Sequence, residues 1–448
     1  MSAKIDVASP ARVALPRELR LTDLVLFNIA ATLGPQLIPA FAHVGPIAIP
    51  LHIAAAALFF VPCVLVVARL SKRFPGEGGF YIWTRQAFGE RHAFICGWSW
   101  WLSVLLFLPT LVLIAADMAW EAAGRGGSAG KEGWQVALAI AALWLIVMLN
   151  ILGLRTTKWL SNVGGVMIYA GGLVVFLAGA AVWLVHGSAT SFHFGAARNL
   201  SRISLWAQIA FAYTGLELGT LMAGEIRNPA KTIPQAAFIS AAAVALGYSA
   251  GSWSLMLVLK PADINPISGL AQVASVAGAR LGIAWLGSLA AVLLVFGILG
   301  KLSTWSAGAA RMPFSLGLDG LFPPAFKALH PRWKTPWLAL VVQGIACTVF
   351  LLFTQTGETL RSGWQLLMDM EILVAFLPYI YIFLSAWKFG QRASGTAGLL
   401  VTLVAMCFAL VPPEHARSVI SFESKALGGS GLLVLLGFLA FRPARRRT

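Results

Sequence analysis

The sequence contains few charged residues. Only 11% of its 448 residues are charged, and acidic residues are the scarcer kind, with 17 Asp and Glu against 33 Lys and Arg. A soluble globular domain is typically about a quarter charged, so this composition excludes that class. Hydrophobic residues make up 58% of the chain, and the mean hydropathy is +0.80. We therefore predict an all-α integral membrane protein.

Cysteine and recognisable catalytic motifs are also scarce. The four cysteines (Cys63, Cys96, Cys347 and Cys407) have the spacing of neither a zinc site nor a disulfide framework. The seven histidines show no metal-ligand spacing, and no nucleophile lies in a recognised motif. There is no phosphate-binding P-loop. We expect no metal, no cofactor, no enzymatic activity and no ATP-driven transport by this chain alone.

What the sequence has in abundance is long apolar runs, and a helix needs about 20 apolar residues to cross a bilayer core. About twelve runs lie near 21–44, 46–68, 93–120, 134–153, 158–185, 204–224, 233–258, 282–306, 336–353, 364–387, 396–412 and 427–441. The longest loops between them, 69–92, 187–203 and 311–336, are too short to bury a core of their own. Residues 1–448 therefore form a single transmembrane domain.

The net charge of +16 suggests nucleic-acid binding, but its distribution indicates a different cause. With the loops taken alternately, roughly 23 Lys and Arg fall on the side of the two termini and about 9 on the other, as the positive-inside rule predicts. Both termini are then cytoplasmic, and the first apolar run is too long to be a signal-peptide core. We expect a lipid bilayer and a small-molecule substrate as partners and no nucleic acid. The sequence does not indicate an oligomeric state.

Two of the runs carry features that an ordinary membrane helix lacks. The first run contains Gly34 and Pro35, and the sixth contains Gly215 and Glu217. Proline removes an amide donor and clashes with the preceding turn, while glycine allows the chain to turn. We predict that both helices break there, around a transport site at the membrane midplane. A simple proline kink is the alternative at Gly34-Pro35.

The positions of these breaks predict an internal symmetry. Five crossings separate the first run from the sixth, so two five-helix units would have opposite orientations. The first inverted repeat then spans 21–185, the second spans 204–387, and two further helices span 396–441. The glycines of the fifth run are spaced by sevens and predict close helix packing; they are Gly164, Gly165, Gly171, Gly172 and Gly179.

Three stretches resemble the amino acid–polyamine–organocation transporter family. The first is Arg73 to Trp83 with Phe88-Gly89 and Gly97-Trp98; the second is Phe211 to Glu217 with Glu225 to Pro229 and Thr232 to Pro234; the third is Ala309 to Pro313 with Gly317 to Pro323, His330 to Arg332 and Thr335-Pro336. The resemblance spans roughly residues 20 to 390. It implies a five-plus-five inverted repeat with two additional helices, which works by alternating access.

The same resemblance implies where the substrate binds, between the two broken helices. Transferred position by position, it assigns Ala31, Thr32, Leu33, Gly34, Pro35 and Gln36 to the first break and Phe211, Ala212, Tyr213, Thr214 and Gly215 to the sixth helix. Phe211 matches an aromatic residue over the substrate, whose ring can hold a cation. Glu217 matches an acidic position that contributes to gating; a buried acid that only caps exposed amides is the alternative.

The first break departs from the glycine-rich pattern of this family. Pro35 has no N–H to offer, so fewer backbone amides are available to bind a substrate carboxylate. This leaves a polyamine or another organic cation open as substrate, and Thr32 or Gln36 are candidates to replace the lost donor.

Further ionisable residues lie within or beside the apolar runs. We predict gating or coupling roles for Lys301 and Asp369, because a lysine within the membrane usually seeks a carboxylate; snorkelling of Lys301 to the interface is the alternative. Glu371 lies two residues from Asp369 and so on a different helix face. Arg311 and Glu77 are expected in loops. The tryptophans, among them Trp100, are expected in interfacial belts.

Taken together, these features predict a secondary transporter, a permease or an exchanger, that moves amino acids or related amines across a bacterial plasma membrane. The alternative within transport is a polyamine or organic-cation carrier. A membrane sensor that binds an amino acid without moving it is the hypothesis from another class; no signalling domain accompanies the chain.

Overall fold

A computed structural model of the protein describes residues 17–76, 78–122, 131–192, 209–265, 269–353, 360–409 and 419–441. The α-helices in this part of the chain are α1 (Leu21–Thr32), α2 (Ile38–His43), α3 (Ala48–Ala55), α4 (Val61–Arg73), α5 (Phe80–Phe88), α6 (Glu90–Ala122), α7 (Lys131–Ile151), α8 (Leu154–His186), α10 (Leu218–Leu221), α11 (Pro229–Val258), α12 (Gly269–Leu281), α13 (Leu286–Leu318), α14 (Trp337–Phe353), α15 (Leu360–Lys388), α16 (Arg392–Ala409) and α17 (Val419–Ala440). Short 3-10 or π turns connect several of them: η1 (Pro35–Leu37), η2 (Ala56–Phe60), η3 (Ala223–Glu225), η4 (Pro261–Asp263) and η5 (Pro324–Lys327).

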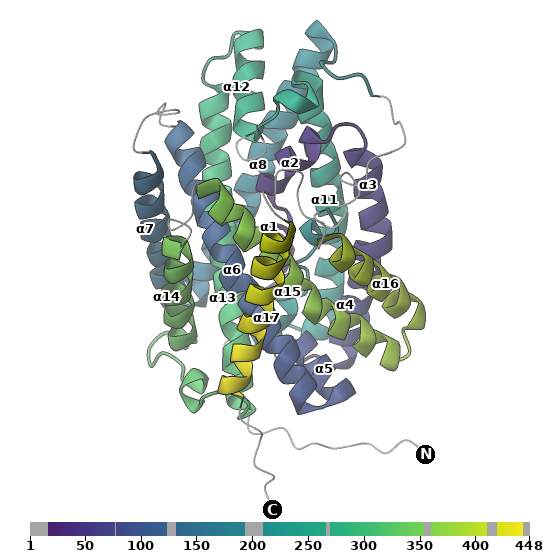
Figure 1. The fold of residues 1–448 in the computed structure, drawn as a ribbon, viewed down its shortest axis with the longest axis vertical. Helices are drawn as coiled ribbons and strands as arrows, with labels where there is room; N and C mark the ends of the chain where they lie inside the picture. The colour runs from purple at the N-terminus through teal and green to yellow at the C-terminus, as the bar shows by residue number, and fades with distance from the viewer. Residues whose placement is uncertain are drawn as a thin grey trace, which may run out of the picture.

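The long helices stand side by side as a bundle (Figure 1). Nine helical segments of the described chain are long and apolar enough to cross a membrane, and Trp337–Leu352 and Leu427–Ala440 are shorter apolar helices. The sixth predicted run is described only from residue 209 onward, and there it forms short pieces rather than one long helix. The predicted all-α membrane fold is confirmed. The division into repeats at 21–185, 204–387 and 396–441 stays a prediction.

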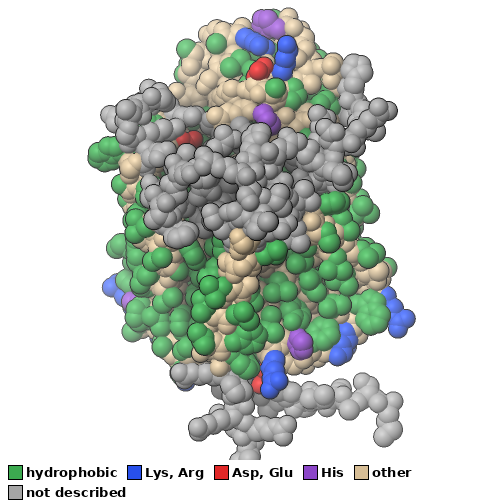
Figure 2. Space-filling model, viewed as in Figure 1, with side chains coloured by type: hydrophobic (Ala, Val, Ile, Leu, Met, Phe, Trp, Pro, Cys, Tyr) green, Lys and Arg blue, Asp and Glu red, His purple; other side chains and the backbone are tan. Residues whose placement is uncertain are grey.

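The outer surface of the bundle is apolar where a bilayer would surround it. Apolar side chains cover much of the visible face in Figure 2, and the Lys and Arg side chains that show there lie toward its two ends. Large exposed side chains include Leu184, Leu246 and Leu439, which are 79%, 67% and 84% exposed. A water-soluble protein rarely exposes so much contiguous apolar surface, so this surface faces lipid.

The predicted glycine packing is confirmed for the centre of α8. A Cβ atom at Gly164 would lie 2.4 Å from the Cα of Gly300 on α13, and one at Gly165 would lie 2.9 Å from a carbonyl of α1. Gly171 and Gly179 also lie against α13 and α11, whereas Gly172 has no neighbour within 4 Å. The small residues let three helix backbones approach closely, which sets the position of α13 relative to α1.

Two helices outside the predicted apolar runs were not indicated by the sequence. α5 lies within 69–92, and its Arg85 forms ion pairs of 2.9 Å with Asp319 and 3.0 Å with Glu90. Tyr81 donates a 2.6 Å hydrogen bond to the Asp319 carboxylate. Burial, together with the adjacent Asp319 carboxylate, raises the pKa of the Tyr81 phenol, which therefore keeps the proton that it donates. α12 lies between the predicted runs 233–258 and 282–306; the thirteen residues of this helix are too few to cross a bilayer.

The predicted loop at 311–336 is also wrong at its start, because α13 continues to Leu318. Arg311 lies inside the helix, where its guanidinium donates to both oxygens of Glu225, at 2.8 and 3.1 Å. Both side chains are buried, at 3% and 4% exposure. A buried charge is tolerated when it is paired and hydrogen-bonded, so Arg311 does not end the helix. Glu77 lies outside the described residues.

Candidate functional site

The first helix breaks where Gly34 and Pro35 predict. α1 ends at Thr32, Leu33 and Gly34 are extended (φ −104°, ψ 93° at Gly34), and a single 3-10 turn follows before α2 begins. Pro35 stands first in that turn, where its missing N–H has no helical partner to lose. The break is therefore an unwound segment between two half-helices and not a simple proline kink.

The sixth helix breaks at Gly215. Residues 209–212 are helical, Tyr213 is in a turn, and the helix resumes only at Leu218. Gly215 has φ +111°, a conformation that favours glycine. A Cβ atom there would also lie 3.2 Å from the Ala31 carbonyl oxygen and 3.0 Å from Trp305. The two breaks thus touch each other, and both predictions are confirmed.

Tyr248 of α11 joins the two unwound segments through one hydroxyl group. Its oxygen accepts the Gly34 N–H at 2.8 Å. Its single proton is shared between the Thr32 carbonyl, at 2.9 Å, and the Ala212 carbonyl, at 3.0 Å. Peptide groups freed inside a membrane must find partners within the protein. Tyr248 supplies partners to three of them.

Lys301 and Trp305 of α13 donate hydrogen bonds to the freed carbonyl groups at the end of α1. The Trp305 indole donates to the Ala31 carbonyl at 2.8 Å, and the Lys301 ammonium donates to the carbonyls of Ala31 and, at 3.4 Å, Leu33. Lys301 is 2% exposed and near the middle of α13. Snorkelling of Lys301 is therefore wrong. Its helix is longer than its apolar run, which places the lysine far from either end.

Glu217 occupies the corresponding place at the break in the sixth helix. Its carboxylate accepts the Gly215 N–H at 3.0 Å, the Tyr379 hydroxyl at 2.5 Å and the Trp100 indole N–H at 3.2 Å. The side chain is fully buried. Each break thus has an ionisable side chain on its freed backbone, a lysine at the first and a glutamate at the second.

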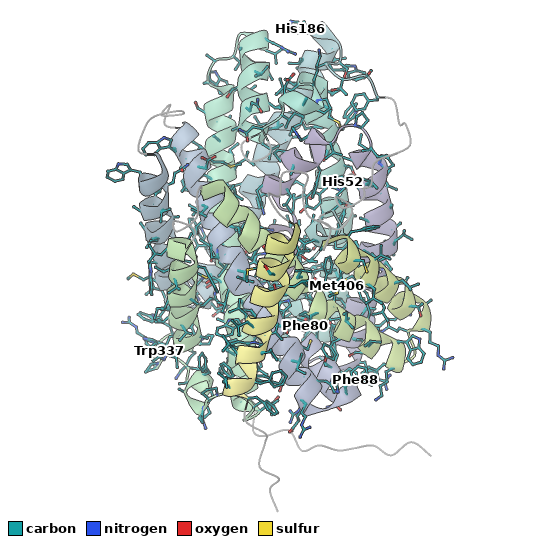
Figure 3. All side chains as sticks on the ribbon, viewed as in Figure 1. His52, Phe80, Phe88, His186, Trp337 and Met406 are labelled. Carbon is teal, nitrogen blue, oxygen red and sulfur yellow. The ribbon has the colours of Figure 1, made fainter. Side chains whose placement is uncertain are left out.

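A cavity lies between the two breaks and leaves about 460 Å³ free of protein atoms, including space that opens outward. Eight of the predicted site residues line it, namely Ala31, Thr32, Gln36, Phe211, Ala212, Thr214, Glu217 and Lys301. Leu33, Gly34, Pro35 and Gly215 form the unwound backbone but are not in the lining. Tyr213 turns the other way, toward His52 of α3, with ring centroids 6.1 Å apart; Figure 3 shows His52 beside that helix.

The rest of the lining consists of residues that sequence reasoning did not assign to the site. α6 contributes Trp100, Ser103, Val104 and Phe107; α13 contributes Trp305; α15 contributes Glu371, Ala375 and Tyr379; and Leu37 belongs to the first break. The side chain of Asp369 lies outside the described part of the chain, whereas Glu371 lines the same cavity as Lys301. Trp100 is 2% exposed and beside Glu217, so its placement in an interfacial belt is wrong.

Several polar atoms in this lining have no partner in the described structure. They are the Thr32 hydroxyl oxygen, the Gln36 amide oxygen and one oxygen of the Glu371 carboxyl group. Buried polar groups are nearly always hydrogen-bonded. Three such atoms around one cavity indicate a place where a polar solute or water completes the hydrogen bonding.

Sequence comparison agrees with this geometry. A family described as amino acid permease matches residues 19–412. The chain belongs to the amino acid permease family. Its relatives include an uncharacterized transporter of Legionella pneumophila, 26% identical over 94% of this chain and 96% of that protein. A probable agmatine/putrescine antiporter of Lactococcus lactis is 21% identical over 86% of each chain. A serine/threonine exchanger of Bacillus subtilis is 24% identical over 74% of this chain and 72% of that one.

Membership of this family fixes the class of activity. The chain is a multi-pass membrane transporter of the amino acid permease family, and it is not an enzyme. The predicted resemblance is thereby confirmed over nearly the whole described chain.

Replacing Tyr248 by Phe should destabilise the permease. The change deletes the hydroxyl group that holds Gly34, Thr32 and Ala212, and unpaired buried polar groups cost about 1–3 kcal/mol. Thermal unfolding of the detergent-purified protein should show a lower Tm. Tyr169→Phe is the matched control, because the Tyr169 hydroxyl group has no hydrogen-bond partner in the described structure. Equal Tm values for the two variants would contradict the bridging role of Tyr248.

Proposed function

We propose that this permease carries amino acids or related amines through the central cavity by alternating access. The observation that supports this most strongly is that the breaks in the first and sixth helices line one cavity together with ionisable side chains. Half-helix ends and unwound carbonyls around a site near the midplane are the usual binding elements of secondary transporters. A broken helix can also tilt its two halves separately, so each half can open one side of the site.

Ion pairs at one end of the bundle support the proposal that the two sides of the site open separately. Arg311 and Glu225 join α13 to the segment that follows the sixth helix, and Arg85 and Asp319 join α13 to α5. Phe88, at the end of α5, and His186, at the end of α8, mark opposite ends of the molecule in Figure 3. In this proposal the α5 end is closed by these pairs, and its opening requires them to separate.

The proposal places the permease in a bacterial plasma membrane with both termini in the cytoplasm. The excess of Lys and Arg on the side of the termini supports this orientation. Since two of the relatives are named as an antiporter and an exchanger, exchange is the mode that we propose to test first.

A polyamine or other organic cation is the second candidate substrate. Glu217 and Glu371 both line the cavity, and one relative is named as a probable agmatine/putrescine antiporter. Counterflow into sealed proteoliposomes, with arginine, glutamate, leucine and putrescine compared, separates the two candidates. Uptake of a zwitterion without amine uptake removes the cation candidate. Saturable binding without flux of any solute would overturn the transport proposal in favour of a sensor.

Phe211→Ala should weaken substrate binding. Phe211 lines the cavity and is 7% exposed, and a ring face holds a desolvated cation with roughly 1–2 kcal/mol, so the apparent affinity should fall about tenfold. Competition against a transported radiolabelled solute measures this. Phe238→Ala, on the outer face of α11 and 52% exposed, is the control. Identical competition curves for wild type and Phe211→Ala would show that the ring does not cover the ligand.

Glu217→Gln should impair transport more than folding. The amide keeps the shape of the side chain but loses the charge that accepts the hydrogen bonds of Tyr379 and Gly215, and a charge-assisted bond of this kind is worth enough to lower the rate about tenfold or more. Initial uptake rates across a range of pH, compared with Asp263→Asn at an exposed position, measure the effect. A normal rate at every pH would refute the proposed role of Glu217.

A further inference from the structure

Two ionisable side chains face the cavity without pairing. Lys301 and Glu371 are each 2% exposed, and both line the cavity. No ion pair between them is found in the described part of the chain, and one oxygen of Glu371 has no hydrogen-bond partner. Two opposite charges buried in a protein normally make contact, because desolvation costs each of them heavily. Both side chains instead line the same cavity, which a ligand could enter.

The surroundings of Lys301 leave part of its ammonium group available. An ammonium group has three protons to donate. Two of them are directed to the carbonyls of Ala31 and Leu33, and the ring of Phe107 lies 5.8 Å from the nitrogen. The hydroxyl group of Thr32 lines the same cavity, and its oxygen has no partner in the described structure. Lys301 and Thr32 together can bind an anionic group.

The backbone at the first break is poorly placed to do this work. The Leu33 N–H donates to Ile29, the Gly34 N–H to the Tyr248 hydroxyl group, and the Leu37 N–H to Gly34. Pro35 has no N–H. At the sixth helix, the Gly215 N–H is already directed at Glu217. The amides that a half-helix could offer to an anion are thus mostly engaged within the protein, whereas the Lys301 ammonium group is not saturated.

We propose that Lys301 and Glu371 determine the specificity of this site: Lys301 receives a carboxylate and Glu371 an ammonium group of the same zwitterionic substrate. This inference rests on the proposed transport function. A diamine of similar length places one ammonium group near Glu371 but the other in the same low-dielectric cavity as Lys301. Like charges repel strongly there, so the site discriminates against diamines.

Pairs of solutes that differ only in the carboxylate test this directly on the wild-type permease. The pairs are leucine with isopentylamine, serine with ethanolamine, ornithine with putrescine, and arginine with agmatine. Binding is measured as the shift in Tm of the purified full-length protein, and transport as counterflow in proteoliposomes. We expect each amino acid that binds to bind about 10- to 100-fold more tightly than its amine, the usual range for one charge-assisted hydrogen bond.

Variants then assign that difference to the two side chains. Lys301→Met should reduce the ratio within each pair to a few-fold, and Lys301→Arg should restore it in part, which a purely structural role in holding Ala31 does not explain. Glu371→Gln should instead weaken leucine relative to 4-methylpentanoate, its analogue without the amine. Asp263→Asn, remote from the cavity, should leave every ratio unchanged.

The outcomes separate the two proposals. If the wild type binds the amines as tightly as their parent amino acids, the specificity proposal is overturned and the transport proposal stays intact. An unchanged ratio in Lys301→Met overturns the role of Lys301. If Lys301→Met does not fold, the affinity ratios of the wild type, Lys301→Arg and Glu371→Gln still test the specificity proposal. Absence of binding and of counterflow for every solute overturns the proposed function and this inference together.

Discussion

The structure depends on one constraint, that peptide groups freed by breaking a helix within a membrane must be satisfied by the protein itself. Two helices break at adjacent points, so their unpaired N–H and C=O groups gather in one place. The Tyr248 hydroxyl, the Lys301 ammonium and the Glu217 carboxylate bind these groups. Tyr248 and Lys301 lie on the long helices α11 and α13, and Glu217 is bonded to Trp100 of α6 and Tyr379 of α15, so the geometry of the breaks is determined by the whole bundle.

The same constraint explains why ionisable side chains lie near the middle of the bundle, where the bilayer midplane would be. A lysine on two backbone carbonyls and a glutamate on a backbone amide are each compensated by the dipoles that the breaks expose. They therefore need no direct contact with each other. Glu371 also lines the cavity, and one oxygen of its carboxyl group has no hydrogen-bond partner among the described residues. In our proposal this carboxyl group receives the ammonium group of the substrate.

The sequence was most informative where one residue determines local backbone geometry. Gly34-Pro35 and Gly215 located the breaks, because a missing donor and a positive φ act within a few residues of the chain. It was least informative about contacts between helices. Trp100 was assigned to the membrane interface but lies beside Glu217, since helical periodicity does not indicate which neighbour a face meets.

By itself, the sequence determined that the chain is an all-helical membrane protein with two interrupted helices, because hydropathy and backbone conformation are properties of short segments. Only the tertiary structure decided which side chains meet those breaks. Trp100, Trp305 and Glu371 come from three helices far apart in the sequence, and their convergence on one cavity results from close packing such as that of Gly164 against Gly300. Such packing is a property of the folded bundle, and no short segment of the chain carries it.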